Sequence, residues 1–166
     1  MTHRLPKKEF EENKHAGNKR RLHQLVLTNE PVGLLAIINN EAIGWISIAP
    51  REQFARLENS RVHKRIDDEK VWSITCFFIK KEYRNQGLSL QILEAAKTFA
   101  KKNKIKILEA YPIKPYADKM PAAFAWTGFY STFIKDFFSI QSFSFSKQIL
   151  NPYGVLIFFF ILQFPG

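Results

Sequence analysis

The first half of the chain alternates short apolar runs with turn residues, a pattern typical of β-strands. Leu34–Ile38 is an apolar run, Asn39-Asn40 is a turn pair that tolerates positive φ, and residues 42–48 are apolar again. This order predicts a β-hairpin. Residues 71–79 are β-branched and aromatic and are apolar on both faces, so we expect a strand in the middle of a sheet.

The next segment has the period of an amphipathic helix. Between residues 88 and 103, the apolar side chains that would share one helix face are Leu88, Ile92, Ala95, Ala96 and Phe99. Lys101 and Lys102 suit the negative carboxyl end of the helix dipole. Residues 105–111 then predict another strand, which Pro112 ends.

Three further segments have weaker patterns. Residues 5–28 predict a very polar helical stretch with a thin apolar stripe. Residues 51–70 are highly charged and predict a short helix followed by a surface loop. Residues 121–136 predict a second helix late in the chain, which Gly128 weakens.

The carboxyl end, residues 138–166, differs from the rest of the chain. Aromatic and polar residues alternate with a phase slip at Ser142, and residues 155–162 then form an unbroken apolar run after a turn signal. That run is too short to span a bilayer, which takes about 20 residues in a helix. We expect a terminal hairpin whose second strand is buried. The alternative is a disordered, aggregation-prone end.

Size and composition fit a single domain over residues 1–166. The one cysteine, Cys76, lies in an apolar run and indicates a small buried side chain. No Cys or His cluster has metal-ligand spacing, so we expect no metal, and the four scattered histidines are expected to be exposed. The amino terminus lacks the apolar core of a secretory signal, which predicts a cytoplasmic location.

A net charge of +10 raises nucleic acid as a partner. The positive residues, however, are spread along the chain in short groups, without a basic tail or a zinc-finger or RRM-like signature. We therefore expect no nucleic-acid partner. Basic residues also suit a pocket for a polyanionic cofactor. A homodimer stays open as an alternative to a monomer.

The arrangement that carries chemistry is a strand, a short polar loop and the amphipathic helix. The loop is Arg84-Asn85-Gln86-Gly87-Leu88-Ser89. A helix start offers unpaired backbone N–H groups and the positive end of the helix dipole, which together form a ready phosphate site. Gly87 lets a phosphate approach the backbone without a Cβ in the way, and Arg84 adds a fixed positive charge.

The run from Phe78 to Ser89 resembles the acetyl-CoA motif of the GNAT superfamily of N-acetyltransferases. That motif is an aliphatic strand end, a linker, and Arg/Gln-x-x-Gly-x-Gly/Ala at a helix start. Arg84 and Gly87 match it, while Ser89 stands where Gly or Ala is usual. The resemblance covers approximately residues 33–136, in which the order of predicted strands and helices also agrees.

This resemblance implies an α/β fold with a mixed, mostly antiparallel twisted sheet of about six strands flanked by helices. The strands 71–79 and 105–111 would be parallel and would splay apart after the motif, opening a V for pantetheine. The backbone of Phe78 and Ile79 would pair with the pantetheine arm of acetyl-CoA. The N–H groups from Gln86 to Ser89 would hold the pyrophosphate.

The resemblance also implies direct transfer of an acetyl group to an amine of a small molecule or a peptide. Many relatives carry an Asn and, seven residues later, a Tyr acid on the late helix. The corresponding positions here are Trp126 and Phe133. Candidate acids and bases are therefore other residues: Tyr130 and Ser131 as acids, and Glu109, then Asp67 or Asp68, as the base. A purely structural role stays open for each of them.

Three hypotheses follow from the sequence. The first is an acetyl-CoA-dependent N-acetyltransferase acting on a primary amine. The second is a non-catalytic acyl-CoA-binding relative, which Phe133 in place of Tyr favours. The third is a basic nucleic-acid-binding module, which only the charge favours.

Overall fold

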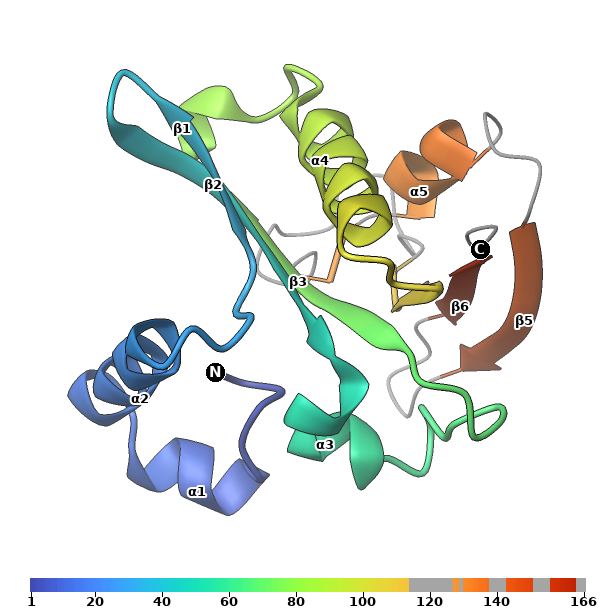
Figure 1. The fold of residues 1–166 in the computed structure, drawn as a ribbon, viewed down its shortest axis with the longest axis horizontal. Coiled ribbons are helices and arrows are strands. Elements are labelled where there is room, and N and C mark those ends of the chain that lie inside the picture. Colours follow the sequence, from blue (N-terminus) through green and yellow to red (C-terminus); the bar gives the residue numbers. More distant parts are fainter. Residues whose placement is uncertain (114–126, 129, 138–142, 151–155, 164–166) are drawn as a thin grey trace.

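The computed structural model describes residues 1–113, 127–128, 130–137, 143–150 and 156–163. These residues form a mixed six-stranded sheet in the order β1-β2-β3-β4-β6-β5 (Figure 1). The strands are β1 (Leu34–Ile38), β2 (Glu41–Pro50), β3 (Trp72–Ile79), β4 (Ile107–Ala110), β5 (Phe143–Leu150) and β6 (Leu156–Gln163). The α/β class and the mixed sheet flanked by helices agree with the expectation.

The β3–β4 pair is parallel, whereas the other described neighbours in the sheet are antiparallel. Helix α4 (Leu88–Lys102) connects these two strands, which confirms the predicted parallel pairing across the motif helix. The predicted hairpin is β1–β2. Both of its turn residues adopt the positive φ that asparagine tolerates, with φ 49 at Asn39 and φ 64 at Asn40.

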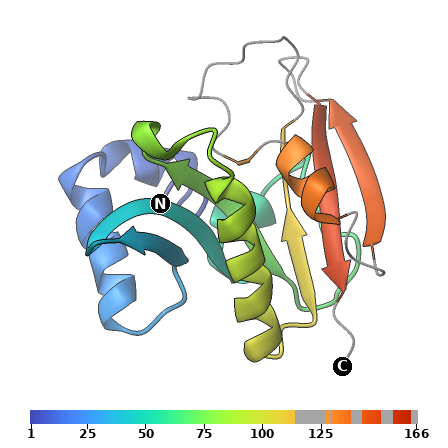
Figure 2. The ribbon, with the colours of Figure 1, turned by 90° about the horizontal axis from the view of Figure 1, so that it is seen from above.

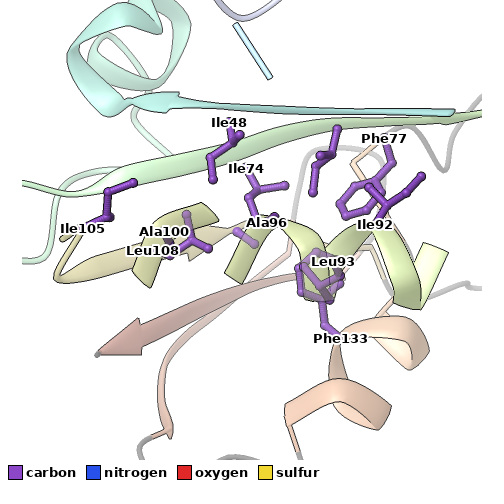
Figure 3. Packing of buried hydrophobic residues seen from close by; sticks show 12 residues of the cluster. Ile48, Ile74, Phe77, Ile92, Leu93, Ala96, Ala100, Ile105, Leu108 and Phe133 are labelled. Carbon is purple, nitrogen blue, oxygen red and sulfur yellow. The ribbon is translucent and has the colours of Figure 1, made fainter. Parts of the chain in front are cut away.

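The main hydrophobic core lies between the sheet and α4. Figure 3 shows side chains of the strands and of α4 pointing toward one another, with Phe133 joining from α5 (Tyr130–Phe137). Of the predicted helix face, Ile92 and Ala96 are buried but Ala95 is exposed. Leu93 and Ala100 are buried in its place, because the stripe that meets the sheet is rotated relative to the predicted one.

Helices α4 and α5 lie side by side on one face of the sheet, which we call the α4 face (Figure 2). The opposite face holds a smaller cluster of Ala49, Phe54, Leu57 and Tyr111. It includes helix α3 (Ala55–Glu58), so we call it the α3 face. The short helix and loop predicted for residues 51–70 correspond to the 3-10 turn η1 (Arg51–Gln53), α3 and the segment that follows.

Residues 5–28 are largely helical, as predicted, but the helical stretch is divided. The structure has two helices, α1 (Lys7–Glu12) and α2 (Ala16–Leu27). His15 between them has φ 59, which a continuous right-handed helix excludes. The amide of Asn18 donates to the carbonyl oxygen of Phe10 at 3.0 Å and holds the two helices in this bend. Together with α3 they gather at the end of the sheet opposite the β1–β2 turn (Figure 1).

The late helix is shorter than predicted within the described residues. It begins at Tyr130, while Gly128 lies before it with φ 90, and residues 121–126 are outside the described part. The terminal hairpin is confirmed as β5 paired with β6. Strand β6 lies between β4 and β5, so it is internal in the sheet. Ser142, where the phase slip was placed, is outside the described residues.

Within the described part of the chain, no helix is both long enough and apolar enough to cross a membrane.

Candidate functional site

The centre of the candidate site is a fork between the two parallel strands. Pairing of β3 with β4 runs from Trp72↔Leu108 to Ile74↔Ala110 and goes no further. Strand β3 continues to Ile79, still paired with β2 on its other side. Its last five residues therefore present their β4-side edge without pairing to β4. This is the V that the resemblance implied.

A β-bulge marks the start of the fork. Ser47 pairs with Cys76 and Ile48 pairs with Ile74, so Thr75 is the extra residue on β3. A bulge bends its strand and increases the local twist. The Thr75 hydroxyl donates to the Ser47 hydroxyl at 3.2 Å and secures the bulge on the buried side. The bend thus coincides with the point at which β3 leaves β4.

Beyond the fork, the chain leads directly to the start of α4. Lys80 N–H donates to the Ile43 carbonyl at 2.9 Å, and the 3-10 turn η2 (Lys81–Tyr83) then reverses the chain. The Arg84 Nε donates to the Ile79 carbonyl at 3.0 Å, which ties the loop back to the strand end. Arg84 itself remains exposed, so its other N–H groups stay available to an anion.

Gly87 caps the helix with a conformation that glycine favours. Its φ is 79, and a Cβ built on it would meet no atom within 4 Å. Its carbonyl accepts from Leu90 N–H at 3.0 Å and from Gln91 N–H at 3.3 Å. The earlier amides of Leu88 and Ser89 belong to the first turn, whose N–H groups point beyond the helix. An open space over backbone amides at a helix start fits a phosphate.

The structure places the remaining predicted loop residues around this open space. Asn85 adopts φ 60 and is exposed. The Gln86 side chain donates to the Glu82 carbonyl at 2.8 Å, so it braces the loop. Phe78 is 51% exposed and Ile79 is half-buried at the end of the fork edge. All eight predicted cofactor residues therefore lie on one continuous stretch from fork to helix.

Glu109, the predicted base, lies on the α3 face of β4 and is buried. Its neighbours Leu108 and Ala110 point into the α4-face core, which leaves Glu109 on the other side. Its Oε1 accepts from Arg51 Nη1 at 2.9 Å and from the hydroxyls of Ser73 and Tyr111. This carboxylate is held by three donors at the base of the fork.

Arg51 is the functional candidate that sequence reasoning missed. It is only 1% exposed, although it lies in a charged segment that predicts a surface loop. Its partners Glu109, on β4, and Tyr111, just after β4, are 58 and 60 positions away in sequence, so no local pattern could connect them. The only sequence signal is its place directly after Pro50, where the apolar strand ends.

Two titratable groups beside Arg51 have shifted pKa values. Burial, followed by the charge of Glu109, raises the pKa of Tyr111 well above its usual value, so the phenol stays protonated. Burial, followed by the charge of Arg51, lowers the pKa of His63 to about 4. The His63 ring packs edge-on against Tyr111 with centroids 4.9 Å apart.

The expectation that all histidines are exposed is wrong for His63 and for His3, because both rings are largely buried.

The two predicted acids begin α5 on the α4 face. Tyr130 is half-buried against the main core and its N–H donates to the Ile113 carbonyl at 3.0 Å, whereas Ser131 is exposed. Phe133 is fully buried with its ring 5.7 Å from that of Phe77. Tyr130 and Glu109 therefore lie on opposite faces of the sheet.

The second-choice bases lie away from the fork. Asp67 and Asp68 are exposed in the loop before β3, and Asp67 accepts from the Glu69 N–H at 3.1 Å. Trp126 is outside the described residues.

The family model described as the acetyltransferase (GNAT) family matches residues 1–129. The chain therefore belongs to the GNAT acetyltransferase family. No curated protein matches it in sequence.

Solved structures share the fold at low sequence identity. A NatC complex bound to Gag peptide and CoA is 14% identical with a TM-score of 0.54, covering 92% of this chain and 82% of that one. A ribosomal-protein-alanine N-acetyltransferase from Brucella melitensis is 16% identical with a TM-score of 0.53, over 89% and 76%. An N-acetyltransferase from Staphylococcus aureus Mu50 is 13% identical with a TM-score of 0.54, over 89% and 75%. These likenesses support the fold of the chain.

Proposed function

We propose that this protein transfers an acetyl group from acetyl-CoA directly to a primary amine of a small molecule or a peptide. The observation that carries the proposal is the continuity of the strand fork with the Gly87 loop. One extended molecule with an anionic end and an amide-bearing arm fits both features at once. Family membership and the CoA-bound NatC structure of the same fold support acetyl-CoA as that molecule.

The residues present fit the cofactor. The open space over Gly87 leaves room for a pyrophosphate against the first amides of α4, and exposed Arg84 supplies positive charge nearby. The β4-side edge of residues 75–79 offers backbone groups to the amides of a pantetheine arm. When bound, acetyl-CoA supplies the thioester; the chain binds it, orients it and handles protons.

Direct transfer, without an acetyl-cysteine, suits the chemistry of the fork. Cys76 lies on β3 just past the last pair with β4, but burial raises the pKa of its thiol. A protonated thiol is a poor nucleophile. The amine must then lose its proton and attack the thioester carbonyl in one ternary complex, which forms the amide bond, breaks the C–S bond and releases the CoA thiolate to take up a proton.

For proton transfer we retain Tyr130 and Ser131 as candidate acids and Glu109 as the candidate base. Tyr130 begins α5 and carries the only hydroxyphenyl group on that described helix. Glu109 already receives three donors, which suits an electrostatic role at the fork better than free proton exchange. The placement of Phe133 in the core, where many relatives have a tyrosine acid, favours the second function, a non-catalytic acyl-CoA-binding protein.

Two assays decide between these functions. Isothermal titration with CoA should show saturable binding, which a basic nucleic-acid module would not give. Thiol release from acetyl-CoA should then depend on an added amine from a panel of polyamines, amino acids and peptides with free amino termini. CoA binding without amine-dependent thiol release would support the non-catalytic protein instead.

A further inference from the structure

Arg51 is a fully satisfied cation inside the protein. Its guanidinium has five N–H groups, and each donates to a different acceptor: Glu58, Glu109, the Tyr111 hydroxyl, and the carbonyls of Leu57 and His63. Lysine, with three donors at one point, could not reproduce this set. The position therefore demands arginine for its geometry as well as its charge.

Two of these partners, Glu109 and Tyr111, lie at the base of the fork. Ser73 pairs with Glu109 one position before the last β3–β4 pair, and its hydroxyl donates to the Glu109 carboxylate. Tyr111 is the first residue after β4. Arg51 thus connects the end of β4 to the segment 57–63 through two carbonyls and one carboxylate, beside the ring contact of His63 with Tyr111.

Stability alone is a weak reason for such a network. Taking an ion pair out of water costs most of the free energy that its attraction returns, and apolar residues of similar size often stabilise a protein equally well. A network with every donor used does, however, hold its members in one arrangement. That property matters where the geometry of two separating strands has to be constant.

The network lies on the face of the sheet opposite α4. The phosphate site at the start of α4 and the helices α4 and α5 are on the α4 face. A pantetheine arm anchored there and lying in the fork would approach from the α4 face, so we assign the α3 face of the fork to the amine. The segment 57–63 and Glu109 border the fork on that side.

We propose that Arg51 is a positioning residue for acetyl transfer, which fixes Glu109, Tyr111 and the segment 57–63 on the amine side of the fork. The inference rests on the proposed function. Arg51 does not touch the cofactor loop, so its loss should impair use of the amine and leave CoA binding as it is. A merely structural role would weaken both together.

The test uses Arg51→Lys in the full chain, with Arg65→Lys as the matched control. Arg65 forms ion pairs with Glu52 and Glu58 in the same charged segment but is partly exposed, and its hydrogen bonds within the described residues go to Glu52, Glu58 and Glu69. CoA affinity is measured by titration, and kcat and KM are measured for the amine that gives the fastest thiol release. Arg51→Lys should lower kcat/KM for the amine by about tenfold or more with unchanged CoA affinity. Arg65→Lys should match the original protein.

A second variant covers the case in which Arg51→Lys does not fold. Arg51→Met/Glu109→Leu replaces the pair with apolar side chains of similar size, so it should fold and bind CoA while amine transfer stays impaired. Transfer at the original rate by either folded variant would overturn the proposal. So would equal losses of CoA affinity and of transfer.

If no amine releases thiol even from the original protein, the proposed function fails and hydrogen exchange decides on Arg51 separately. Amides of residues 57–63 and 109–113 should exchange about tenfold faster or more in Arg51→Lys than in Arg65→Lys, at equal CoA affinity. Identical exchange in the two variants would refute the positioning role.

Discussion

The two sides of the fork are built in opposite ways. On the α4 face, the cofactor loop is one continuous, mostly exposed stretch whose shape follows from its own glycine and asparagine conformations. On the α3 face, Arg51, Ser73 and Glu109 come from three separate elements and are buried together. The first side depends on backbone groups, and the second on side-chain charges.

This difference predicts which property of the protein a substitution on each side should change. Backbone amides at a helix start bind any phosphate ester and carry little information about the rest of a ligand. A buried network of side chains can change with a single substitution, and it borders the side proposed for the amine. We therefore expect the loop to determine cofactor affinity and the Arg51 network to determine acceptor use.

The largest effect is expected from removing β6, the strand that pairs with β4 beside the Arg51 network. Deletion of residues 150–166 removes β6, which lies between β4 and β5, and so exposes the edge of β4 beside Glu109. The truncated protein should be insoluble or molten, because an unpaired internal edge and core become exposed. Removing residues 165–166 leaves β6 intact and is the control. A truncated protein that melts cooperatively and still binds CoA would contradict this expectation.

Acid should weaken the α3 face before it affects the loop. Burial lowers the pKa of both His3 and His63 to about 4, from 6.5. The unfolded chain therefore binds more protons between these values, and stability falls as the pH drops from 6.5 toward 4. Each histidine should contribute up to about 1.4 kcal/mol per pH unit to the free energy of unfolding. Urea unfolding across this range measures the slope.

The control for this pH dependence is His23→Gln, at an exposed position on α2. It should leave the slope unchanged, whereas His63→Gln should reduce it. A slope that is the same in both variants would show that His63 does not contribute.

A smaller effect, on CoA affinity, is expected from the Arg84 side chain of the loop. Arg84→Ala should weaken CoA binding by about three- to tenfold at low ionic strength, and the loss should shrink in high salt because exposed charges are screened. Lys102→Ala removes a cation at the far end of the same helix and is the matched control. Equal losses in the two variants would indicate a general charge effect in place of a site at Arg84.

The same contrast explains what the sequence could predict. The β1–β2 hairpin, the motif helix and the Gly87 loop depend on neighbours a few residues away, and all three were predicted. Arg51 was not, because its burial depends on Glu109 and Tyr111, which the fold brings to it from a distant strand. A charged side chain in a charged segment gives no local sign of being internal.

The break between α1 and α2 was missed for a related reason. The sparse apolar positions, Phe10 and then Leu22, Leu25 and Val26, indicate helical structure but do not locate a break within it. The bend at His15 is instead held by the contact of Asn18 with Phe10 across the turn. Asparagine side chains that bond to a backbone carbonyl offer the chain an alternative to a continuous helix.

The central claim is that the backbone around Gly87 holds the phosphates of CoA, and Gly87→Asn tests it most directly. Asparagine tolerates the positive φ of this position, as Asn85 does in the same loop, so the fold should persist while the new side chain fills the open space. Asn40→Gly, at an exposed positive-φ position in the β1–β2 turn outside the loop, adds no atoms and is the control. In isothermal titration, Gly87→Asn should bind CoA at least about tenfold more weakly than the original protein, and Asn40→Gly should bind it as before. A folded Gly87→Asn variant with unchanged CoA affinity would contradict the account.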